Sequence, residues 1–328
     1  MRLAALRTWT RACVRDPRFP GGLIAALFIA LVAHTAVATG IMLILFPELG
    51  ALSVDVFSRP GGLWARHPLH LAFTPALTAI LGLVVTRSLG YGFLSVSLVV
   101  AGSMLILQVL KSPIAPAISA AVLPLALDIR SWGYPAAILL GTATLAVVST
   151  VHRKLLGPVG IEARALATDP TDDLMEGAAV RYLWIPFFCL FLGVSLLLVR
   201  LTGWRLILFP PAIVIGYEMF AHPRECPWVH RPYLLPVACA LTATAGLGFT
   251  LGLGVSAWAA TASMGFGILV LRLFDLHIPP ALAVGLLPLA MAAPDYRFPL
   301  SVAIGTTLLT AIFLLYRRRI PVHAVAEP

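Results

Sequence analysis

Charged residues are scarce in this chain. Only 11% of its 328 residues are charged, whereas 60% are hydrophobic, and the mean hydropathy is +0.96. A soluble domain carries about 25% charged residues, so this composition excludes an ordinary water-soluble fold. Several apolar stretches reach roughly 18–25 residues, the length with which a helix crosses about 30 Å of hydrocarbon. The short alternating segments of a membrane β-barrel are too few. The sequence therefore predicts an all-α polytopic membrane protein.

Motifs of enzymes and cofactor sites are also missing. The sequence contains no nucleotide-binding loop, no HExxH, no GxSxG and no heptad run. Its cysteines form no CxxC pair and have no metal-ligand spacing; they are Cys13, Cys189, Cys226 and Cys239. We therefore expect no enzymatic activity, no cofactor and no metal. The net charge of +9 comes from basic residues at helix ends and in loops, so it does not indicate a nucleic-acid partner.

The strongest positive signal is an internal repeat at an offset of 164 residues. Residues 112–154 align with 276–318 without a gap, so that SPIAPAISAAVLPLALD lies over LHIPPALAVGLLPLAMA. With one residue of slippage, ILFPELGALSVDVFSRP at 44–60 lies over ILFPPAIVIGYEMFAHP at 207–223. Aligned prolines and glycines do not arise from shared apolar composition alone. The pattern predicts two tandem pseudo-symmetric copies of one helical unit.

Each half reads as about six helical segments, of which the second and fifth are short and rich in Pro and Gly. The expected segments are 21–45, 47–58, 68–86, 91–109, 112–127 and 134–151, then 182–200, 206–221, 232–251, 255–273, 278–293 and 298–316. The short segments are either short crossings or re-entrant hairpins. Short crossings give twelve crossings in all, which we favour, and re-entrant hairpins give eight, which is the alternative. Short, Pro-interrupted segments at matching places in two repeats indicate the binding site of a transporter.

Basic residues set the expected orientation. Arginines of the N-terminal arm, Arg153 and Lys154 in the central connection, and Arg317 to Arg319 in the tail all place these regions in the cytoplasm. An even number of crossings per half then makes the repeats parallel, and the expected location is a bacterial inner membrane. The expected parts are a cytoplasmic basic arm at 1–19, repeat 1 at 20–152, a cytoplasmic linker at 153–181, repeat 2 at 182–317 and a cytoplasmic tail at 318–328.

Two acids occupy equivalent positions inside the first short segment of each half. These are Asp55 in SVDVF and Glu218 in GYEMF. An ionisable group inside a membrane is expensive and indicates function, and burial of a carboxyl suits a proton-coupled step. The alternative is that both acids face headgroups or pair with a nearby arginine. The loops that follow contain Arg59, His222 and Arg224, which suit attraction of an anion, clamping of the short helix, or simply a positively charged cytoplasmic loop.

The second short segment supplies the other candidates for a solute pathway. Lys111 precedes it in the first half and His277 in the second. Pro116, Pro279 and Pro280 fix where its helices begin, and a helix N-terminus in the membrane favours an anionic ligand. A histidine at a membrane helix end is more often structural. Aromatic residues near the expected helix ends are interpreted as interfacial anchors; they are Trp64, Trp132, Trp204, Trp228 and Tyr296.

Each half resembles the HPP family of small integral membrane proteins. Gly50-Ala51-Leu52-Ser53 is similar to the family's Gly-Ala-Ser/Thr-like turn before a short helix, and His222-Pro223-Arg224-Glu225 to its Gln-Pro-Arg-like loop. Ile278-Pro279-Pro280-Ala281 resembles the His-Pro-Pro-Ala signature, with Ile114-Ala115-Pro116-Ala117 as a degenerate copy. The histidine is one residue early in the second half and absent from the first. The resemblance implies a divergent tandem relative of a family whose plant members are associated with nitrite transport.

The sequence therefore favours a transporter or channel for a small anionic solute, nitrite-like by this resemblance, with proton coupling as an option. Exporters of the fusaric-acid-resistance type also have duplicated halves with basic ends, so an exporter of small organic acids is one alternative. A non-transporting assembly or sensory subunit is the other. The expected partners are the solute and the lipid bilayer, and association of the chain with itself is left open.

Overall fold

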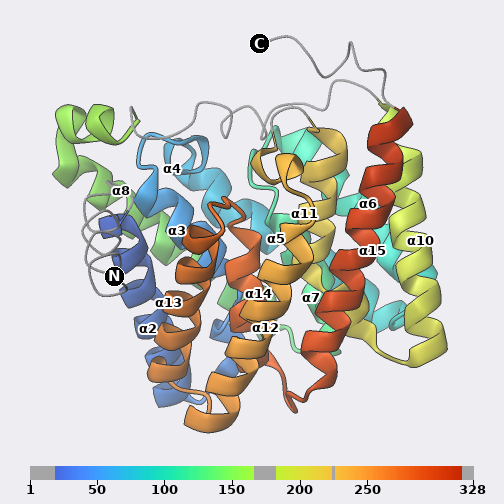
Figure 1. The fold of residues 1–328 in the computed structure, drawn as a ribbon. Helices are drawn as coiled ribbons and strands as arrows, with labels where there is room; N and C mark the ends of the chain where they lie inside the picture. The colour runs from blue at the N-terminus through green and yellow to red at the C-terminus, as the bar shows by residue number, and fades with distance from the viewer. Residues whose placement is uncertain (1–18, 166–181, 224–225, 320–328) are drawn as a thin grey trace, which may run out of the picture.

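The structure, a computed structural model, describes residues 19–165, 182–223 and 226–319. All regular secondary structure in these ranges is helical (Figure 1). The first half contains α2 (Phe19–Thr39), η1 (Met42–Ile44), α3 (Glu48–Ser58), α4 (Leu63–Arg66), α5 (Pro68–Leu89), α6 (Phe93–Leu110), α7 (Ala117–Leu127) and α8 (Gly133–Ala165). The second contains η2 (Tyr182–Trp184), α10 (Ile185–Thr202), η3 (Arg205–Leu208), α11 (Pro210–Ala221), η4 (Pro227–His230), α12 (Leu234–Leu253), α13 (Ala257–Leu273), α14 (Pro280–Ala290) and α15 (Arg297–Arg319).

Long apolar helices form the outside of the molecule. Seven helices of the described part are long and apolar enough to cross a membrane, namely α2, α5, α6, α8, α10, α12 and α15. Their outer faces leave large apolar side chains uncovered: Val109 is 72% exposed and Leu201 is 73% exposed. Such faces are unfavourable in water and match a lipid environment. The chain is an integral membrane protein.

The chain runs between two ends of the molecule. The upper side is the end at the top of Figure 1, where α8 and α15 finish, and the lower side is opposite. In this view α2, α5 and α7 run downward, while α3, α6 and α8 run upward. The second half repeats the directions, with α10, α12 and α14 running downward and α11, α13 and α15 upward. Each half thus begins and ends on the upper side.

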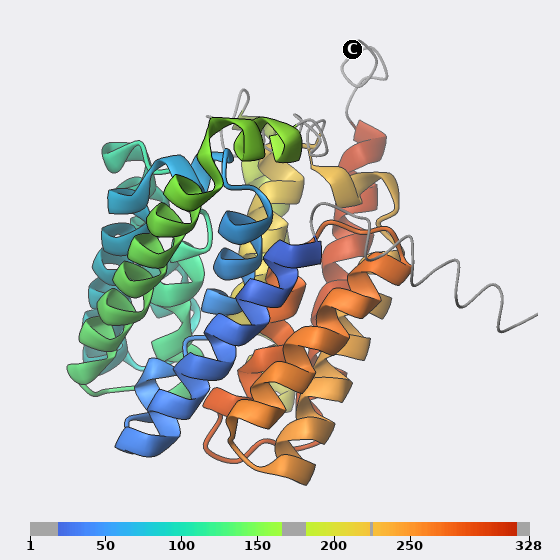
Figure 2. The same cartoon turned by 90° about the vertical axis from the view of Figure 1, so that its left-hand side faces the viewer.

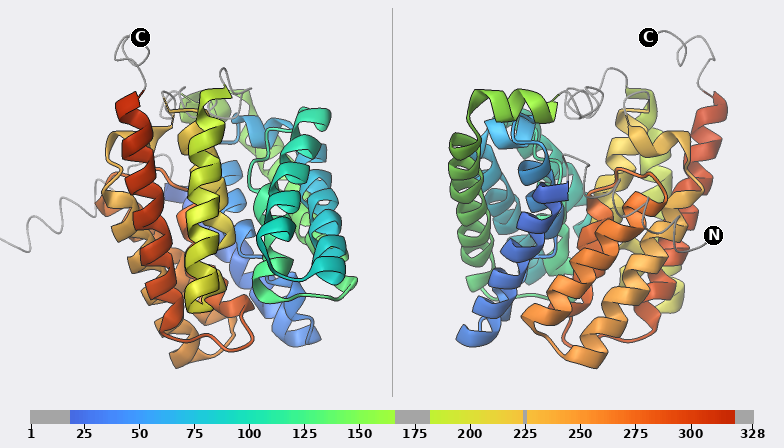
Figure 3. Two further views of the ribbon diagram at one scale, coloured as in Figure 1. Left: turned by 90° about the vertical axis from the view of Figure 1, so that its right-hand side faces the viewer. Right: turned by 60° about the vertical axis from the view of Figure 1, so that its left-hand side comes forward.

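Four short helices make up the interior, and we call them the short-helix layer: α3, α7, α11 and α14. Each has 11 or 12 residues, and nearly all of these residues are buried. At 1.5 Å per residue such a helix is roughly 17 Å long, about half the hydrocarbon thickness. The layer joins the halves, because α3 packs on α14 and α7 packs on α11. Figures 2 and 3 show the long helices around it.

The short helices sit unusually close to the long helices of their own half. A Cβ atom added to Gly82 of α5 would lie 1.9 Å from the carbonyl oxygen of Ala121 in α7. A Cβ atom added to Gly246 of α12 would lie 2.0 Å from the carbonyl oxygen of Gly285 in α14. Small residues permit such close backbone approach inside membranes, where dispersion contacts hold helices together.

The two flanks of the contact between the halves differ. On one flank α2 packs along α13, whereas the described residues of the counterpart pair, α10 and α6, do not pack side by side. On that second flank the Tyr91 hydroxyl donates a hydrogen bond of 3.4 Å to the carbonyl oxygen of Arg205, whose guanidinium lies over the Tyr91 ring. Burial raises the pKa of Tyr91 and the Arg205 charge partly offsets this, so the hydroxyl stays protonated as a donor.

The twelve expected segments all occur as helices, with shifted ends. The first expected segment extended to residue 45, but α2 ends at Thr39 and η1 follows a turn at Gly40, which has φ +72°. The expected linker began at residue 153, but α8 continues to Ala165 with a kink at Gly157, which has φ +66°. Gly50 to Ser53 were expected as a turn before a short helix, but they lie inside α3. Pro47 begins that helix, because proline fits the position just before a helix.

Two of the expected interfacial anchors are buried instead. Trp64 is 3% exposed, and its indole N–H donates a hydrogen bond of 3.1 Å to the carbonyl oxygen of Pro113. Trp228 is 1% exposed. Trp64 lies in α4, directly after the short helix α3, and Trp228 lies in η4, directly after the short helix α11. The chain folds back after each short helix, so both rings are covered. Trp132 and Tyr296 are exposed near helix ends, as expected of anchors.

Candidate functional site

The N-termini of the short helices lie near the middle of the molecule. Thr78 is central in α5, and its hydroxyl donates a hydrogen bond of 2.6 Å to the carbonyl oxygen of Ala117, the first residue of α7. Gly50, in the first turn of α3, faces Met264 at the centre of α13. Gly285, in the middle of α14, faces Thr242 near the centre of α12, so this downward helix begins roughly 7 Å higher. The starts of α3 and α7 bring the positive ends of their helix dipoles to this central depth.

The N-terminus of α11 lies below the central depth. Its midpoint Gly216 faces Leu309, which lies at the centre of α15. The first residue, Pro210, is six residues earlier and therefore roughly 9 Å further down. The starts of α3 and α7, both in the first half, thus lie nearest the central depth, with the start of α11 below it and that of α14 above it.

Prolines begin each short helix. Pro47 precedes α3, Pro210 opens α11, Pro116 precedes α7, and Pro279 and Pro280 open α14. Proline has no N–H to lose at the first turn, so it fixes the start without an extra unsatisfied donor. The remaining N–H groups of each first turn have no acceptor within their own helix. Pro116, Pro279 and Pro280 are buried and do not face lipid, and their helices α7 and α14 pack on helices of the other half.

A carboxyl group sits at one of these N-termini. Glu48 is the first residue of α3 and is 2% exposed. Neither of its carboxyl oxygens makes a hydrogen bond of normal geometry within the described part of the chain. The nearest polar groups are its own backbone N–H and the hydroxyl of Ser119, in the first turn of α7. The Ser119 hydroxyl, fully buried, also makes no hydrogen bond of normal geometry there.

Tyr134 completes this buried group, which we call the Glu48 cluster: Glu48, Ser119 and Tyr134. Tyr134 begins α8, is 1% exposed and lies within electrostatic range of Glu48. Its hydroxyl donates a hydrogen bond of 2.7 Å to the carbonyl oxygen of Ala120. That oxygen has no helical partner because the residue four positions later, Pro124, lacks an N–H. The break in α7 therefore holds Tyr134 in place.

The predicted acid Asp55 lies in a clamp within its own helix. It is 1% exposed and accepts hydrogen bonds from Nε of Arg59, at 2.8 Å, and from Nη2 of the same side chain. Arg59 is itself 6% exposed. The pair neutralises both charges one turn apart, which corresponds to the expected alternative of an acid paired with a nearby arginine. Asp55 and Arg59 are thus brought together at the upper end of α3.

Glu218 holds the equivalent place in α11, in a different setting. It is 4% exposed, and its carbonyl oxygen accepts a hydrogen bond of 3.0 Å from the backbone N–H of His222. The buried ring of His222 meets the Tyr217 ring edge-on at 5.8 Å. Arg224, the third residue predicted here, lies outside the described residues. Asp55 and Glu218 lie on two different helices, α3 and α11, that each contact α14.

The other predicted pathway residues lie at the upper ends of the helices. Lys111 ends α6 in a left-handed conformation with φ +49°, and its side chain is exposed. Its counterpart Asp275 has the same conformation with φ +50°. His277 is half-buried between α13 and α14. The structure therefore places Lys111 and His277 above the short helices, apart from the Glu48 cluster.

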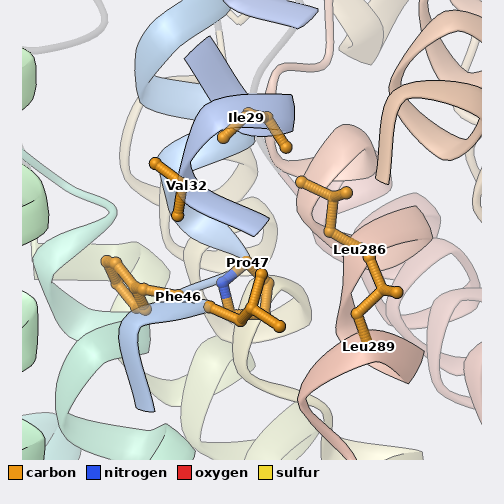
Figure 4. A pocket seen from close by; sticks show the side chains of 7 residues that line it. Ile29, Val32, Phe46, Pro47, Leu286 and Leu289 are labelled. Carbon is orange, nitrogen blue, oxygen red and sulfur yellow. The ribbon is translucent and has the colours of Figure 1, made fainter. Parts of the chain in front are cut away.

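A small apolar pocket opens beside the start of α3 (Figure 4). It is lined by Ile29, Val32, Leu45, Phe46, Pro47, Leu286 and Leu289, which come from α2, the approach to α3, and α14. The pocket thus lies between the halves, next to Glu48 in the sequence. All of its lining side chains are apolar. Within the described residues, no group of three His, Cys, Asp or Glu side chains is placed to hold a metal ion.

Sequence reasoning overlooked Glu48, although a signal was present. It lies in ILFPELG, which aligns with ILFPPAI, so an acid stands in an apolar run where the other half has Pro211. Attention to acids that the two halves share favoured Asp55 and Glu218 over an acid found in only one half.

Comparison with known proteins adds no relative. No family model, curated protein or solved structure matches this chain.

Proposed function

We propose that this chain transports a small solute across the membrane, along a path between two tandem copies of one helical unit. One observation carries the proposal: four buried half-length helices, two from each half, pack on one another where the halves meet, and each has an end inside the molecule. Discontinuous helices of this kind supply binding sites in transporters, because their free N–H groups substitute for the water that a solute loses. A protein with a purely structural role has no need to end helices inside the hydrocarbon.

The elements of the two halves support the duplication. Each half has a long helix, a 3₁₀ turn, a short helix, a one-turn helix, two long helices, a short helix and a long helix. Starts at Phe93 and Ala257, and at Gly133 and Arg297, are 164 residues apart. The same spacing relates the close contacts of Gly82 and Gly246. Equal spacing of elements and of packing details follows from one ancestral unit.

The N-termini favour an anionic solute. Backbone N–H groups at a helix start donate to anions, and the helix dipole adds a favourable potential. The layer contains four such ends, and those of α3 and α7 lie near each other at Glu48 and Ser119. A small anion such as nitrite fits this chemistry and the resemblance to the HPP family, and a small organic acid is the second candidate. The described residues give no observation that favours an enzyme.

We place the upper side in the cytoplasm of a bacterial cell. The upper ends of the helices carry Arg66, Lys111, Arg153, Lys154, Arg231, Arg272 and Arg317 to Arg319. The lower ends carry Arg87, Arg130, Arg200, Arg205 and Arg297. An excess of basic residues marks the cytoplasmic side. Single cysteines replacing Lys154 and Asp295 should be labelled from opposite sides of the membrane by an impermeant maleimide; labelling of both from one side would contradict this topology.

Flux into proteoliposomes tests the proposal. Purified protein should carry nitrite, or another member of a panel of small inorganic and organic anions, faster than protein-free vesicles do. Removal of Pro280, in the variant Pro280→Ala, should slow this flux because the start of α14 is no longer fixed. Gly248→Ala, in the exposed face of α12, is the control and should transport normally. Folded protein that moves none of these anions would favour the assembly or sensory alternative.

A further inference from the structure

The Glu48 cluster consists of three polar side chains in an otherwise apolar part of the interior. Glu48, Ser119 and Tyr134 come from three different helices of the first half, and each side chain is almost fully buried. In the second half, Pro211 aligns with Glu48 at an offset of 163 residues. Ala283 aligns with Ser119 and Phe298 with Tyr134, both at an offset of 164 residues. All three polar side chains are thus replaced by apolar ones. Packing alone does not require them, since the second half packs the same elements without them.

Among the described side chains of the helices packed around α3, none places a positive charge beside Glu48. The helices packed on α3 are α2, α8 and α14, with α4 at its upper end and η1 before it. The single titratable group in the described α2 residues 20–39 is His34, which is exposed, and η1, α7 and α14 have none. From α8 only Tyr134 faces Glu48, while His152, Arg153 and Lys154 lie at the upper end. On α3 itself, Asp55 and Arg59 neutralise each other about two turns higher.

A carboxylate in this position has two options. An ionised carboxylate buried without a cation costs several kcal/mol, and the dipole of α3 offsets only about 1 kcal/mol of that. A protonated carboxyl is neutral and needs one acceptor for its O–H, which the Ser119 oxygen can provide. The burial and the absence of a nearby cation therefore favour the protonated form at rest.

We propose that Glu48 and Ser119 form a proton-binding site that couples solute movement to proton movement, one proton for each chain. This inference rests on the proposed transport function and identifies its coupling group. The protonated carboxyl donates to the Ser119 oxygen; when the proton leaves to water, the carboxylate accepts from the first-turn N–H groups of α3. Carboxylate and anionic solute then compete for the same helix ends, so the solute enters with a proton on Glu48. The second half adds no proton because Pro211 stands at the counterpart position.

Infrared difference spectroscopy tests the site without any transport. Purified protein titrated from acid to alkaline pH should show the C=O band of a protonated carboxyl that persists at neutral pH, and the band should be absent from Glu48→Gln. Ser119→Ala should shift the band to the frequency of a carboxyl without a hydrogen bond. The control, Glu218→Gln, should retain the band. A neutral-pH band that is absent, or unchanged in Glu48→Gln, would overturn the proposal.

Labelling of the natural protein covers the case in which Glu48→Gln does not fold. Dicyclohexylcarbodiimide is apolar and reacts with protonated carboxyls inside membranes. It should modify the peptide containing Glu48 at neutral pH, at least tenfold more than the peptide containing Asp55, whose carboxylate is paired with Arg59. Equal labelling of the two peptides, or none at Glu48, would contradict a protonated Glu48.

Coupling is then measured in proteoliposomes. An inward proton gradient should drive anion uptake in the natural protein, with one proton per solute, and should lose this effect in Glu48→Gln. Uptake that ignores the gradient in the natural protein would refute the coupling while leaving transport intact. If no solute moves although the infrared band is present, the proposed transport function fails and the proton site alone remains. The two failures are thereby distinguished.

Discussion

Alanine at Gly246 tests the close packing that holds α14 against α12. An added Cβ would lie 2.0 Å from the carbonyl oxygen of Gly285, whereas real Cβ atoms essentially never approach below 3.0 Å. The helices must therefore separate by at least 1 Å at this point. Overpacking costs about 1–3 kcal/mol, and we expect the upper end because a backbone carbonyl cannot rotate away as a side chain can. For a chain of 328 residues, a loss of about 3 kcal/mol corresponds to a fall of roughly 4 °C in melting temperature.

The measurement is thermal unfolding in detergent, followed by the loss of the monodisperse peak in gel filtration. Gly248→Ala is the matched control: it lies in the same helix, and an added Cβ meets nothing within 4 Å. Alanine there removes a glycine from a helix interior, which gains about 1 kcal/mol, so its melting temperature should stay equal or rise. Gly82→Ala should repeat the loss in the first half. A melting temperature for Gly246→Ala that matches the control would refute the close contact and, with it, the described position of α14.

Two further predictions concern buried polar contacts. Arg59→Gln should destabilise the protein by about 3–5 kcal/mol, because it removes the arginine that neutralises the buried Asp55 carboxylate. The double variant Arg59→Gln/Asp55→Asn should recover most of this loss. No recovery would show that the two residues act separately. Trp64→Phe should cost about 1–2 kcal/mol in the same thermal assay, since it leaves the carbonyl oxygen of Pro113 without this donor. Trp228→Phe should cost less, because this indole N–H has no hydrogen-bond partner within the described residues; equal losses would contradict the assignment.

Much of the fold follows from the sequence because the membrane restricts the options. In hydrocarbon every backbone N–H and C=O must be paired within the chain, so a long apolar run becomes a helix. All twelve expected segments are helices for this reason. Their ends differ from the expected ones where water or loop residues can pair the backbone N–H and C=O groups. The extension of α8 past Lys154 was not predicted, because a helix can continue into water once Gly157 redirects it. Whether the halves superpose about an axis along the membrane normal stays a prediction.

The positions of tryptophan were harder to predict. A tryptophan near a helix end suits the interface, where its ring lies in hydrocarbon and its N–H in water. Trp64 and Trp228 follow short helices rather than full-length ones, so the chain after them folds back over the interior and covers their rings. Periodicity and composition indicate how long a segment is but not what covers its end.

The candidate site shows a limit of choosing site residues by comparing the two halves of the sequence. Comparing the two halves drew attention to Asp55 and Glu218, because acids at aligned positions stand out. The structure shows that at least Asp55 is neutralised by a neighbour on its own helix.

Under the proposed transport function, the group that binds the proton need not occur in both halves. Two identical proton sites on one pathway would be occupied by two protons whose charges and positions interfere, so one copy is free to become apolar. Glu48, Ser119 and Tyr134 follow this logic, since all three are polar in the first half and all three are apolar in the second. In a membrane repeat protein, the sites where the copies differ together in chemistry, while the backbone stays the same, are therefore as informative as those where they agree.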